Sequence, residues 1–243
     1  MFIYKLIIVM NDNNQGFIIL IKKVKDNDLF VKILTDKDEI ITGLVYGGNS
    51  SKKKSIYQIG YFIEFNFTQK NNSAPKSIKA EIIKPYINNI MNNKFKSYSL
   101  LNIISLINIS ILEGQKLASI FVSVKNIIEI VSYNKNWISH YCEWLMSFLK
   151  IIGYQIEYKN KSNLEYFNLL SNELSVNKLN NSIKFPHMIF QHNSKINFDD
   201  LNNFFQIFES IFSKSHLDNL NYKMPINFIN FKEIVLKELR NKS

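Results

Sequence analysis

The sequence contains few of the residues that build disulfides, zinc sites and nucleotide loops. Cys142 is the only cysteine among 243 residues, so an internal disulfide and a cysteine-rich zinc site are both excluded. A reducing compartment is the simple expectation for such a chain. The motif Gly-x-x-x-x-Gly-Lys-Ser/Thr does not occur, so there is no sequence basis for ATP hydrolysis.

Long apolar runs are missing as well. The apolar run of residues 1–10 is too short to span a bilayer, and it lacks the small-residue cleavage site of a signal peptide. We expect Met10 to be an alternative or the true start, with residues 1–9 as an appendage. Residues 1–13 are therefore assigned to an N-terminal extension. No later segment approaches the length of a transmembrane helix.

Arginine is nearly absent, since Arg240 is the only one, yet the chain is basic, with a formal net charge of +10. Residues 1–96 carry 15 lysines against 8 acidic residues, whereas residues 97–243 carry 15 basic against 12 acidic residues. Codon bias of an AT-rich genome explains lysine in place of arginine, but less easily the excess of lysine over acids. The N-terminal part should therefore face nucleic acid, an anionic membrane or an acidic protein tail.

Residues 16–84 have the short apolar segments and polar turns that are typical of strands. The predicted strands cover residues 16–24, 29–35, 40–46, 61–67 and 78–83. In the fourth, Tyr61, Ile63, Phe65 and Phe67 share one face by two-residue alternation. Five short strands within about seventy residues predict a small closed barrel, because closure removes exposed edges.

After residue 97 the apolar spacing changes to three and four, which predicts amphipathic helices. They cover residues 100–111, 120–131, 137–152, 199–216 and 231–239. Gly153 suits a helix C-terminus, and acidic residues at 199 and 200 suit a helix N-terminus. No element is predicted over residues 155–195. The fold class is α+β multidomain: a five-stranded barrel domain (14–85), a connector (86–97) and an all-helical domain (98–243).

A glycine pair and a lysine run mark the candidate functional site. Gly47-Gly48 follows the third strand and precedes Lys52-Lys53-Lys54, and Gln58-Ile59-Gly60 then turns into the fourth strand. Glycines let a backbone pass close to a bulky group, and adjacent ammonium groups repel one another unless an anion is near. A phosphate backbone suits this arrangement, and lysine contacts would not read sequence.

The candidate DNA-binding residues combine this loop with the basic end of the first strand. They are Lys22, Lys23, Lys25, Gly47, Gly48, Lys52, Lys53, Lys54 and Tyr57. Tyr46 and Tyr61 are further candidates for stacking on bases. The alternative is that the lysines solvate a strand end and a surface loop, and that the tyrosines belong to the core or its rim.

Three stretches resemble the RecO family of bacterial DNA repair proteins, over about residues 14–240. Residues 15–20 (QGFIIL) are similar to the family's opening strand. Residues 43–60 resemble its glycine pair, basic loop and Gln-Pro-Gly turn, although Ile59 replaces the proline. Residues 149–154 (LKIIGY), at the end of a helix pair, resemble its Leu-x-x-Leu-Gly-Phe/Tyr helix end.

The resemblance implies an N-terminal OB-fold and a helical C-terminal domain in a recombination mediator without catalytic residues. It implies binding to single- and double-stranded DNA, strand annealing and recombinase loading in the cytoplasm, in association with the nucleoid. The implied partners are RecR and the acidic tail of single-stranded DNA-binding protein, for which Lys116, Lys125 and Lys135 are rim candidates. Some members carry zinc-binding cysteines where this chain has none, so no metal or cofactor is expected.

Other chemistry has weaker support in the sequence. Cys142 and His140 do not converge on a helix, and a buried thiol is the simpler interpretation. His187 and His192 are five residues apart, so on a helix their side chains would point in different directions. Asp199 and Asp200 are read as helix-start residues rather than catalytic carboxylates. The main rival function is an OB-fold RNA-binding or ribosome-associated protein, and the second is a metal-independent enzyme that uses those carboxylates.

Overall fold

The chain forms two compact units in the computed structural model. Unit 1 comprises Met1–Asn92 with Ile103–Val122, and unit 2 comprises Asn93–Asn102 with Ser123–Ser243. The structure describes residues 8–25, 27–84, 86–159, 161, 163–191 and 195–241, with the backbone alone over residues 8–13. Residues 1–7 of the predicted extension and His192 lie outside this part. Among the described helices, none has both the length and the apolar character needed to cross a membrane.

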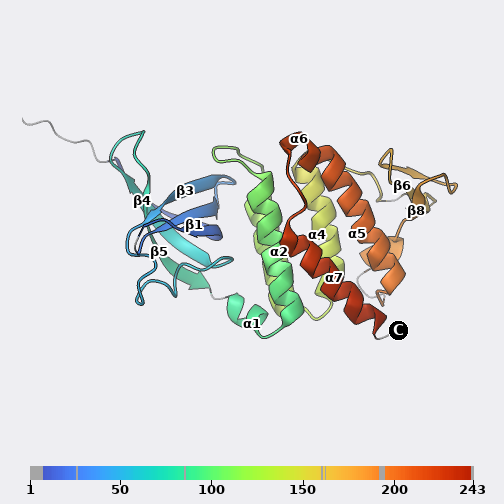
Figure 1. Cartoon of the computed structure of the whole chain (residues 1–243), viewed down its shortest axis with the longest axis horizontal. Helices are drawn as coiled ribbons and strands as arrows, with labels where there is room; N and C mark the ends of the chain where they lie inside the picture. Colours follow the sequence, from blue (N-terminus) through green and yellow to red (C-terminus); the bar gives the residue numbers. More distant parts are fainter. Residues whose placement is uncertain are drawn as a thin grey trace, which may run out of the picture. The chain divides into compact units, whose positions relative to one another are not determined.

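Unit 1 is built around a closed five-stranded barrel, drawn in blue to teal in Figure 1. Its strands are β1 (Ile8–Lys23), β2 (Leu29–Thr35), β3 (Ile40–Val45), β4 (Phe62–Gln69) and β5 (Ser77–Lys84). They close in the order β1-β2-β3-β5-β4. The barrel that alternation predicted is therefore confirmed.

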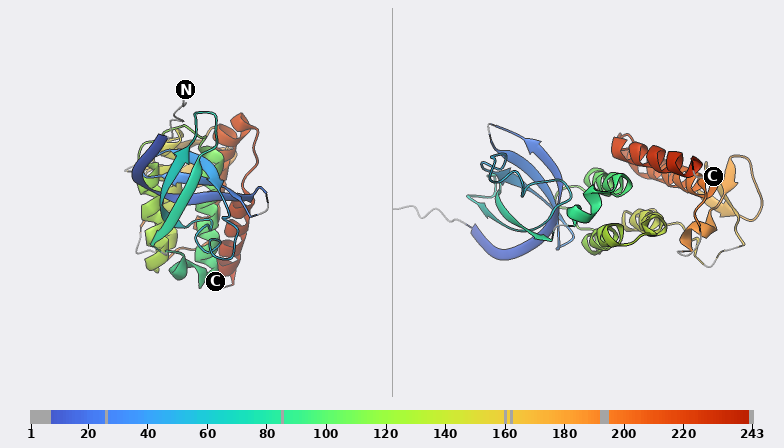
Figure 2. Two further views of the ribbon diagram at one scale, coloured as in Figure 1. Left: turned by 90° about the vertical axis from the view of Figure 1, so that its left-hand side faces the viewer. Right: turned by 90° about the horizontal axis from the view of Figure 1, so that it is seen from below.

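β1 is long because it closes the barrel. Its first part pairs with β4 and its last part pairs with β2, so the strand bends strongly around the barrel (Figure 2). Gly16 lies at the change of partner and pairs with both Thr35 and Ile63. A Cβ atom there would lie 2.5 Å from Ile33 Cγ2 and 2.7 Å from the carbonyl oxygen of Leu34, so this crossing requires glycine.

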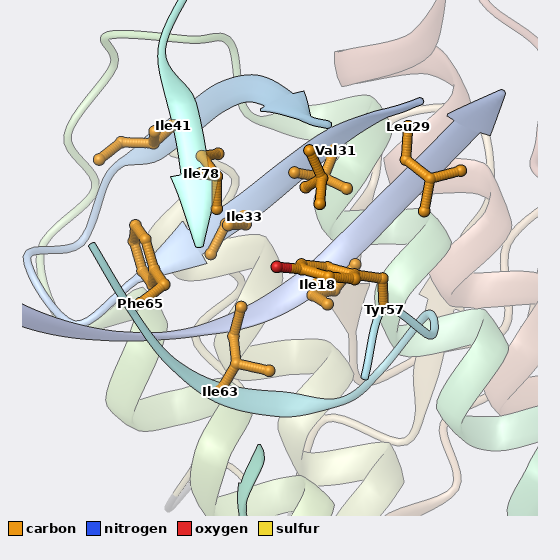
Figure 3. Packing of buried hydrophobic residues seen from close by; sticks show 10 residues of the cluster. Ile18, Leu29, Val31, Ile33, Ile41, Tyr57, Ile63, Phe65 and Ile78 are labelled. Carbon is orange, nitrogen blue, oxygen red and sulfur yellow. The ribbon is translucent and has the colours of Figure 1, made fainter. Parts of the chain in front are cut away.

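The inner faces of the strands supply the barrel core, as the alternation predicted. Full burial of one aliphatic side chain contributes about 1.5–3 kcal/mol, so a cluster of this size stabilises unit 1 strongly. The cluster in Figure 3 comprises Ile18, Leu29, Val31, Ile33, Ile41, Val45, Tyr57, Ile63, Phe65 and Ile78.

A second apolar cluster covers the outside of β1 and β4. The rings of Phe17 and Phe62 stack with centroids 4.8 Å apart. Tyr86 and Phe121 pack on them, with centroids 5.9 Å from Phe62 and from Phe17 respectively. All four side chains are buried. Segments beyond the last strand therefore complete the packing of the barrel.

Lys32 is a half-buried lysine on the outer face of β2. Its ammonium group donates to the carbonyl oxygens of Asn108 and Ile111, at 3.0 and 3.2 Å, where helix α2 (Lys94–Ser110) ends. A cation at a helix C-terminus satisfies carbonyl groups that have no partner within the helix. Burial lowers the pKa of Lys32, and the nearby carboxylate of Glu113 opposes this shift.

The turn between β2 and β3 holds the start of helix α3 (Ile120–Tyr133). The carboxylate of Asp38 accepts hydrogen bonds from the backbone N–H groups of Ser119, at 2.8 Å, and of Phe121, at 2.9 Å. N–H groups in the first turn of a helix lack partners within the helix, and a carboxylate stabilises them. Asp38 thus acts as a helix cap from a distant part of the chain.

Replacing Asp38 by alanine should lower the free energy of unfolding by about 2 kcal/mol. The change removes the cap, and it also places alanine at a residue with φ of 60°, where a Cβ is unfavourable. Urea denaturation of Asp38→Ala would measure the loss, and Asp38→Asn should lose less because asparagine tolerates this φ and keeps an acceptor. The exposed neighbour Asp36 is the control, since Asp36→Ala should change stability by less than about 0.5 kcal/mol. Equal losses for the Asp36 and Asp38 alanine variants would contradict the capping role.

Helices account for most of the chain after the barrel. Besides α2 and α3 they are α1 (Ile87–Met91), α4 (Trp137–Ile151), α5 (Phe198–Phe212), α6 (Asp218–Leu220) and α7 (Ile226–Arg240), with a 3₁₀ turn (His187–Phe190) and a π-helical turn (Ser213–Leu217). The connector predicted over residues 86–97 is not irregular, since it contains α1 and the first residues of α2. Burial of Ile87 and Ile90 explains why this polar segment is helical.

The core of unit 2 is rich in aromatic side chains. The predicted stripe on α4 is confirmed as core, because Trp137, Tyr141, Trp144 and Phe148 are all buried. Tyr141 meets Phe231 of α7 edge-on, with ring centroids 5.0 Å apart. Helices α5 and α7 lie side by side (Figures 1 and 2), and the Lys232 ammonium group bonds both carboxylate oxygens of Glu209 between them.

The C-terminus of α4 and the N-terminus of α5 lie where the sequence predicted a helix end and a helix start. Gly153 has a φ of 97° after α4, and the N–H of Tyr154 donates to the carbonyl of Leu149 at 2.8 Å. This is a Schellman C-terminus. At the start of α5, the side chain of Asn197 accepts a hydrogen bond from the N–H of Asp200, and Asp199 lies in the same first turn. The interpretation of the two carboxylates as helix-start residues is confirmed.

A small sheet adds strands to a domain that was predicted to be all-helical. Strands β6 (Tyr166–Asn168), β7 (Glu173–Ser175) and β8 (Ser182–Lys184) form a three-stranded antiparallel sheet in the order β7-β6-β8. It lies in the region where the sequence predicted no element. Three-residue strands are too short to show alternation, so periodicity could not reveal them.

Candidate nucleic-acid interface

Two loops meet at one end of the barrel. The first is the β1–β2 turn, residues 24–28, and the second is the long loop between β3 and β4, residues 46–61. The Gly47 N–H donates to a carboxylate oxygen of Asp28 at 2.7 Å, and the Asn49 N–H donates to the carbonyl of Asn27 at 2.8 Å. These bonds hold the start of the long loop against the turn.

The predicted basic residues lie on these two loops and on the adjoining end of β1. All six side chains are exposed, and none forms an ion pair with a carboxylate in the described part of the chain. Among them, the ammonium group of Lys53 donates to the carbonyl of Tyr46 at 3.0 Å, an exposed hydrogen bond within the loop. The six are Lys22, Lys23, Lys25, Lys52, Lys53 and Lys54. Uncompensated ammonium groups on neighbouring loops favour a polyanion, because it relieves their mutual repulsion.

The glycine pair shapes the loop, and each glycine does so for a different reason. Gly47 has a φ of 64° and open space around it, so its conformation requires glycine while its surroundings do not. Gly48 is buried, and a Cβ there would lie 2.8 Å from Val45 Cγ1 and 3.0 Å from Leu29 Cδ1. Both residues therefore have structural roles at the loop's beginning.

Tyr57, predicted to contact DNA, belongs instead to the barrel core. Its side chain is 5% exposed, and Figure 3 shows its ring among the buried aliphatic residues. Its hydroxyl oxygen accepts a hydrogen bond from the N–H of Ala80 at 3.1 Å. Burial raises the pKa of Tyr57, which the bond from Ala80 partly offsets. A ring enclosed in this way cannot stack on a base, so the assignment of Tyr57 to the interface was wrong.

The other two tyrosines differ from Tyr57 and from each other. Tyr61 is partly buried and packs against the barrel core. Tyr46 follows β3 directly and is 54% exposed beside the lysines. Tyr46 is therefore an exposed aromatic ring at this end of the barrel, as the aliphatic side chains of Val24 and Ile59 are also exposed.

The three lysines predicted as a partner rim lie on separate segments of the described chain. Lys116 belongs to unit 1 and pairs with Glu39 at 3.9 Å, next to the isolated bridge between the same two residues. Lys125 lies on α3, and Lys135 lies between α3 and α4. Unit 2 has hollows of about 570 and 400 Å³, and neither is lined by these residues. The predicted role of the three lysines stays a prediction.

The cysteine and the histidine considered as reactive or metal-binding groups have surroundings that are typical of structural residues. Cys142 is completely buried, and this burial, with a smaller effect from Glu143, raises the pKa of its thiol well above the usual value. Such a thiol is unreactive. A ring nitrogen of His187 lies 2.9 Å from the carbonyl of Leu164. In the part of the chain that the structure describes, no three His, Cys, Asp or Glu residues are grouped to hold a metal ion.

Fold and surface together define a class of protein. A closed barrel in the order β1-β2-β3-β5-β4 is the OB fold, which binds oligonucleotides and oligosaccharides in many proteins. Here the barrel presents lysines at one end and is followed by a mainly helical unit.

Comparison with known proteins shows which proteins this chain is similar to. Residues 14–83 match the family described as RecO N terminal. Curated relatives named DNA repair protein RecO include those of Rickettsia canadensis (strain McKiel), 26% identical over 202 residues, and Orientia tsutsugamushi (strain Boryong), 27% identical over 147 residues. The first match covers 79% of this chain and 83% of the relative, and the second covers 60% and 61%. A third, from Rickettsia akari (strain Hartford), is 29% identical over 61% of this chain and 62% of the relative. The barrel thus matches the RecO N-terminal family, and most of the chain is similar to curated RecO proteins.

Proposed function

We propose that this protein acts in DNA repair as a recombination mediator whose barrel binds single- and double-stranded DNA without sequence preference. The observation that carries the proposal is the meeting of two lysine-bearing loops at one end of an OB barrel. Lysine ammonium groups bind phosphates as point charges and do not read base edges, so binding should depend on salt and not on sequence. Exposed Tyr46 would add stacking on an unpaired base.

The mechanism that follows is strand annealing and help in loading recombinase. Two complementary strands are polyanions, and a basic surface lowers the repulsion between them as they approach. Binding must also be weak enough to release the annealed duplex. Exposed lysines on loops suit this requirement, because each contributes a weak and reversible contact. No step of this mechanism needs a catalytic side chain or a cofactor.

Partners and location extend the same proposal. The resemblance to RecO proteins supports RecR and the acidic tail of single-stranded DNA-binding protein as partners, and the cytoplasm, at the nucleoid, as the place of action. Lys125 and Lys135 of unit 2 are the proposed contacts for the acidic tail, with Lys116 of unit 1 as a further candidate.

Replacing Lys52, Lys53 and Lys54 together by alanine should weaken DNA binding. If each lysine neutralises one phosphate, the slope of log affinity against log salt should become shallower by about 2–3. Fluorescence anisotropy with a labelled oligonucleotide over a salt series measures both quantities. The matched control is the triple alanine variant of Lys159, Lys161 and Lys178, which removes equal charge from exposed positions of unit 2.

Unchanged affinity and slope in the first variant would remove this loop from the interface. Equal weakening in both variants would show that net charge alone drives binding. The rival RNA-binding function predicts that RNA displaces single-stranded DNA of equal length, and a clear preference for RNA would favour that rival.

A further inference from the structure

The barrel is closed between β3 and β5 by very little pairing. The two strands run parallel, and they pair at a single position, Leu44 with Ser77. β3 ends at Val45, while β5 continues to Lys84 and pairs with β4 along its length. The second half of β5 therefore has a strand on one side and, among the described residues, no strand on the other.

The backbone of this half-strand presents hydrogen-bonding groups at the open edge. The N–H of Ala80 donates to the hydroxyl of Tyr57, so it points away from β4. Groups two residues apart in a strand point the same way, which places the N–H and the carbonyl of Ile82 at the same edge. No described residue forms a hydrogen bond with Ile82 there. An edge of this kind is a template for another strand.

The side chains at this edge are also incompletely covered. Ile78, Ala80 and Ile82 share the inner face of β5, but Ile78 is 2% exposed whereas Ile82 is 39% exposed. The next residue, Ile83, is 41% exposed, at the register shift where β5 slips relative to β4. Two adjacent isoleucines on opposite faces of one strand are thus open to water.

The charge around the edge is positive. From residue 76 to residue 84 the chain carries Lys76, Lys79 and Lys84 against Glu81, and Glu64 of β4 pairs with Glu81, so three lysines stand against two acids. The long loop that reaches Ala80 through Tyr57 carries the lysine run of residues 52–54 as well. A segment that pairs with β5 is therefore favoured if it is acidic.

We propose that the open edge of β5 binds an extended acidic segment of a partner protein, which adds a strand to the barrel beside residues 80–84. Main-chain hydrogen bonds to Ile82 would provide affinity, apolar side chains of the segment would cover the two isoleucines, and its carboxylates would meet the lysines. A nucleic acid has no alternating N–H and carbonyl groups, so it cannot pair with the edge in this way.

The test uses the full chain and a fluorescent peptide of about ten residues that alternates valine with glutamate. A control peptide of equal charge has proline in place of every valine, so it lacks the backbone N–H groups that point to one side of the strand. Ile82→Pro removes the N–H at the open edge but no hydrogen bond of the β4–β5 pair, and Ile82→Val keeps that N–H. We expect the alternating peptide to bind wild type and Ile82→Val at least about tenfold more tightly than Ile82→Pro, and more tightly than the control peptide binds wild type.

Circular dichroism and thermal melting establish that the Ile82→Pro variant is folded. If it is not, the comparison of the two peptides on wild type decides the test, because they carry equal charge and differ in their backbone donors. Equal binding of both peptides, or of wild type and Ile82→Pro, would show attraction of charge alone and overturn the proposal. So would the absence of binding at about 1 mM peptide, which would identify the lysines as a device that blocks the edge. DNA affinity should be unchanged by Ile82→Pro, and a parallel loss would make this edge part of the DNA interface instead.

Discussion

Replacing Tyr57 by alanine should lower the free energy of unfolding by about 3–5 kcal/mol, the largest loss expected for any substitution in the long loop. The ring is part of the buried cluster of the barrel, so its removal leaves a cavity among aliphatic side chains. The change also leaves the N–H of Ala80 without its hydroxyl acceptor. Urea denaturation followed by circular dichroism measures this loss.

Tyr57→Phe separates the packing of this ring from its hydrogen bond. Phenylalanine keeps the ring, so the expected loss is about 1–2 kcal/mol, from the unsatisfied N–H of Ala80. DNA affinity and its salt slope should match those of wild type, because the hydroxyl is enclosed in the core. Weaker DNA binding by a Tyr57→Phe variant of unchanged stability would contradict the core assignment and return this residue to the interface.

Replacing Gly16 by alanine should cost about 3 kcal/mol, although it adds a single methyl group. The new Cβ would lie 2.5 Å from Ile33 Cγ2 and 2.7 Å from a backbone oxygen of β2, and the backbone oxygen cannot move aside as a flexible side chain does. The strands must separate or β1 must shift, and either change loosens the closure of the barrel.

Gly47→Ala is the matched control for Gly16→Ala. No atom lies within 4 Å of the Cβ position at Gly47, so the cost there is limited to the unfavourable positive φ, about 1 kcal/mol. Thermal or urea unfolding of both variants gives the comparison. Similar losses for the two would show that close packing at Gly16 is not what requires glycine.

The sequence predicted the barrel because its strands are short apolar segments between polar turns, and β4 alternates over most of its length. Ile63 and Phe65 were placed in the core by spacing alone. The spacing did not reveal the burial of Phe62, whose outward ring packs against Phe121, a residue about sixty positions away. Periodicity within one strand carries no information about which distant segment will cover its other face.

The candidate site was predictable in its charges and not in its aromatic rings. A lysine side chain in a surface loop is exposed to solvent in almost any loop conformation, so the exposure of Lys52–Lys54 follows from composition. A single tyrosine in a loop has no periodic neighbours to show which way it points. Tyr46 and Tyr57 therefore looked alike, although one is exposed and the other lies in the core. The cap by Asp38 was hidden for a related reason, since its helix starts about eighty residues later.

The side chains of Lys32, Phe17 and Phe62 contact residues beyond the last strand of the barrel. These contacts affect how the protein can be divided into fragments. A polypeptide cut at residue 85 would retain every strand of the barrel, yet it would lose Phe121 and the carbonyl acceptors of Lys32. Its bare rings would make it prone to self-association. Because unit 1 is discontinuous along the chain, no single scission releases it whole. An autonomous fragment would need residues 103–122 joined back to the barrel by an artificial linker.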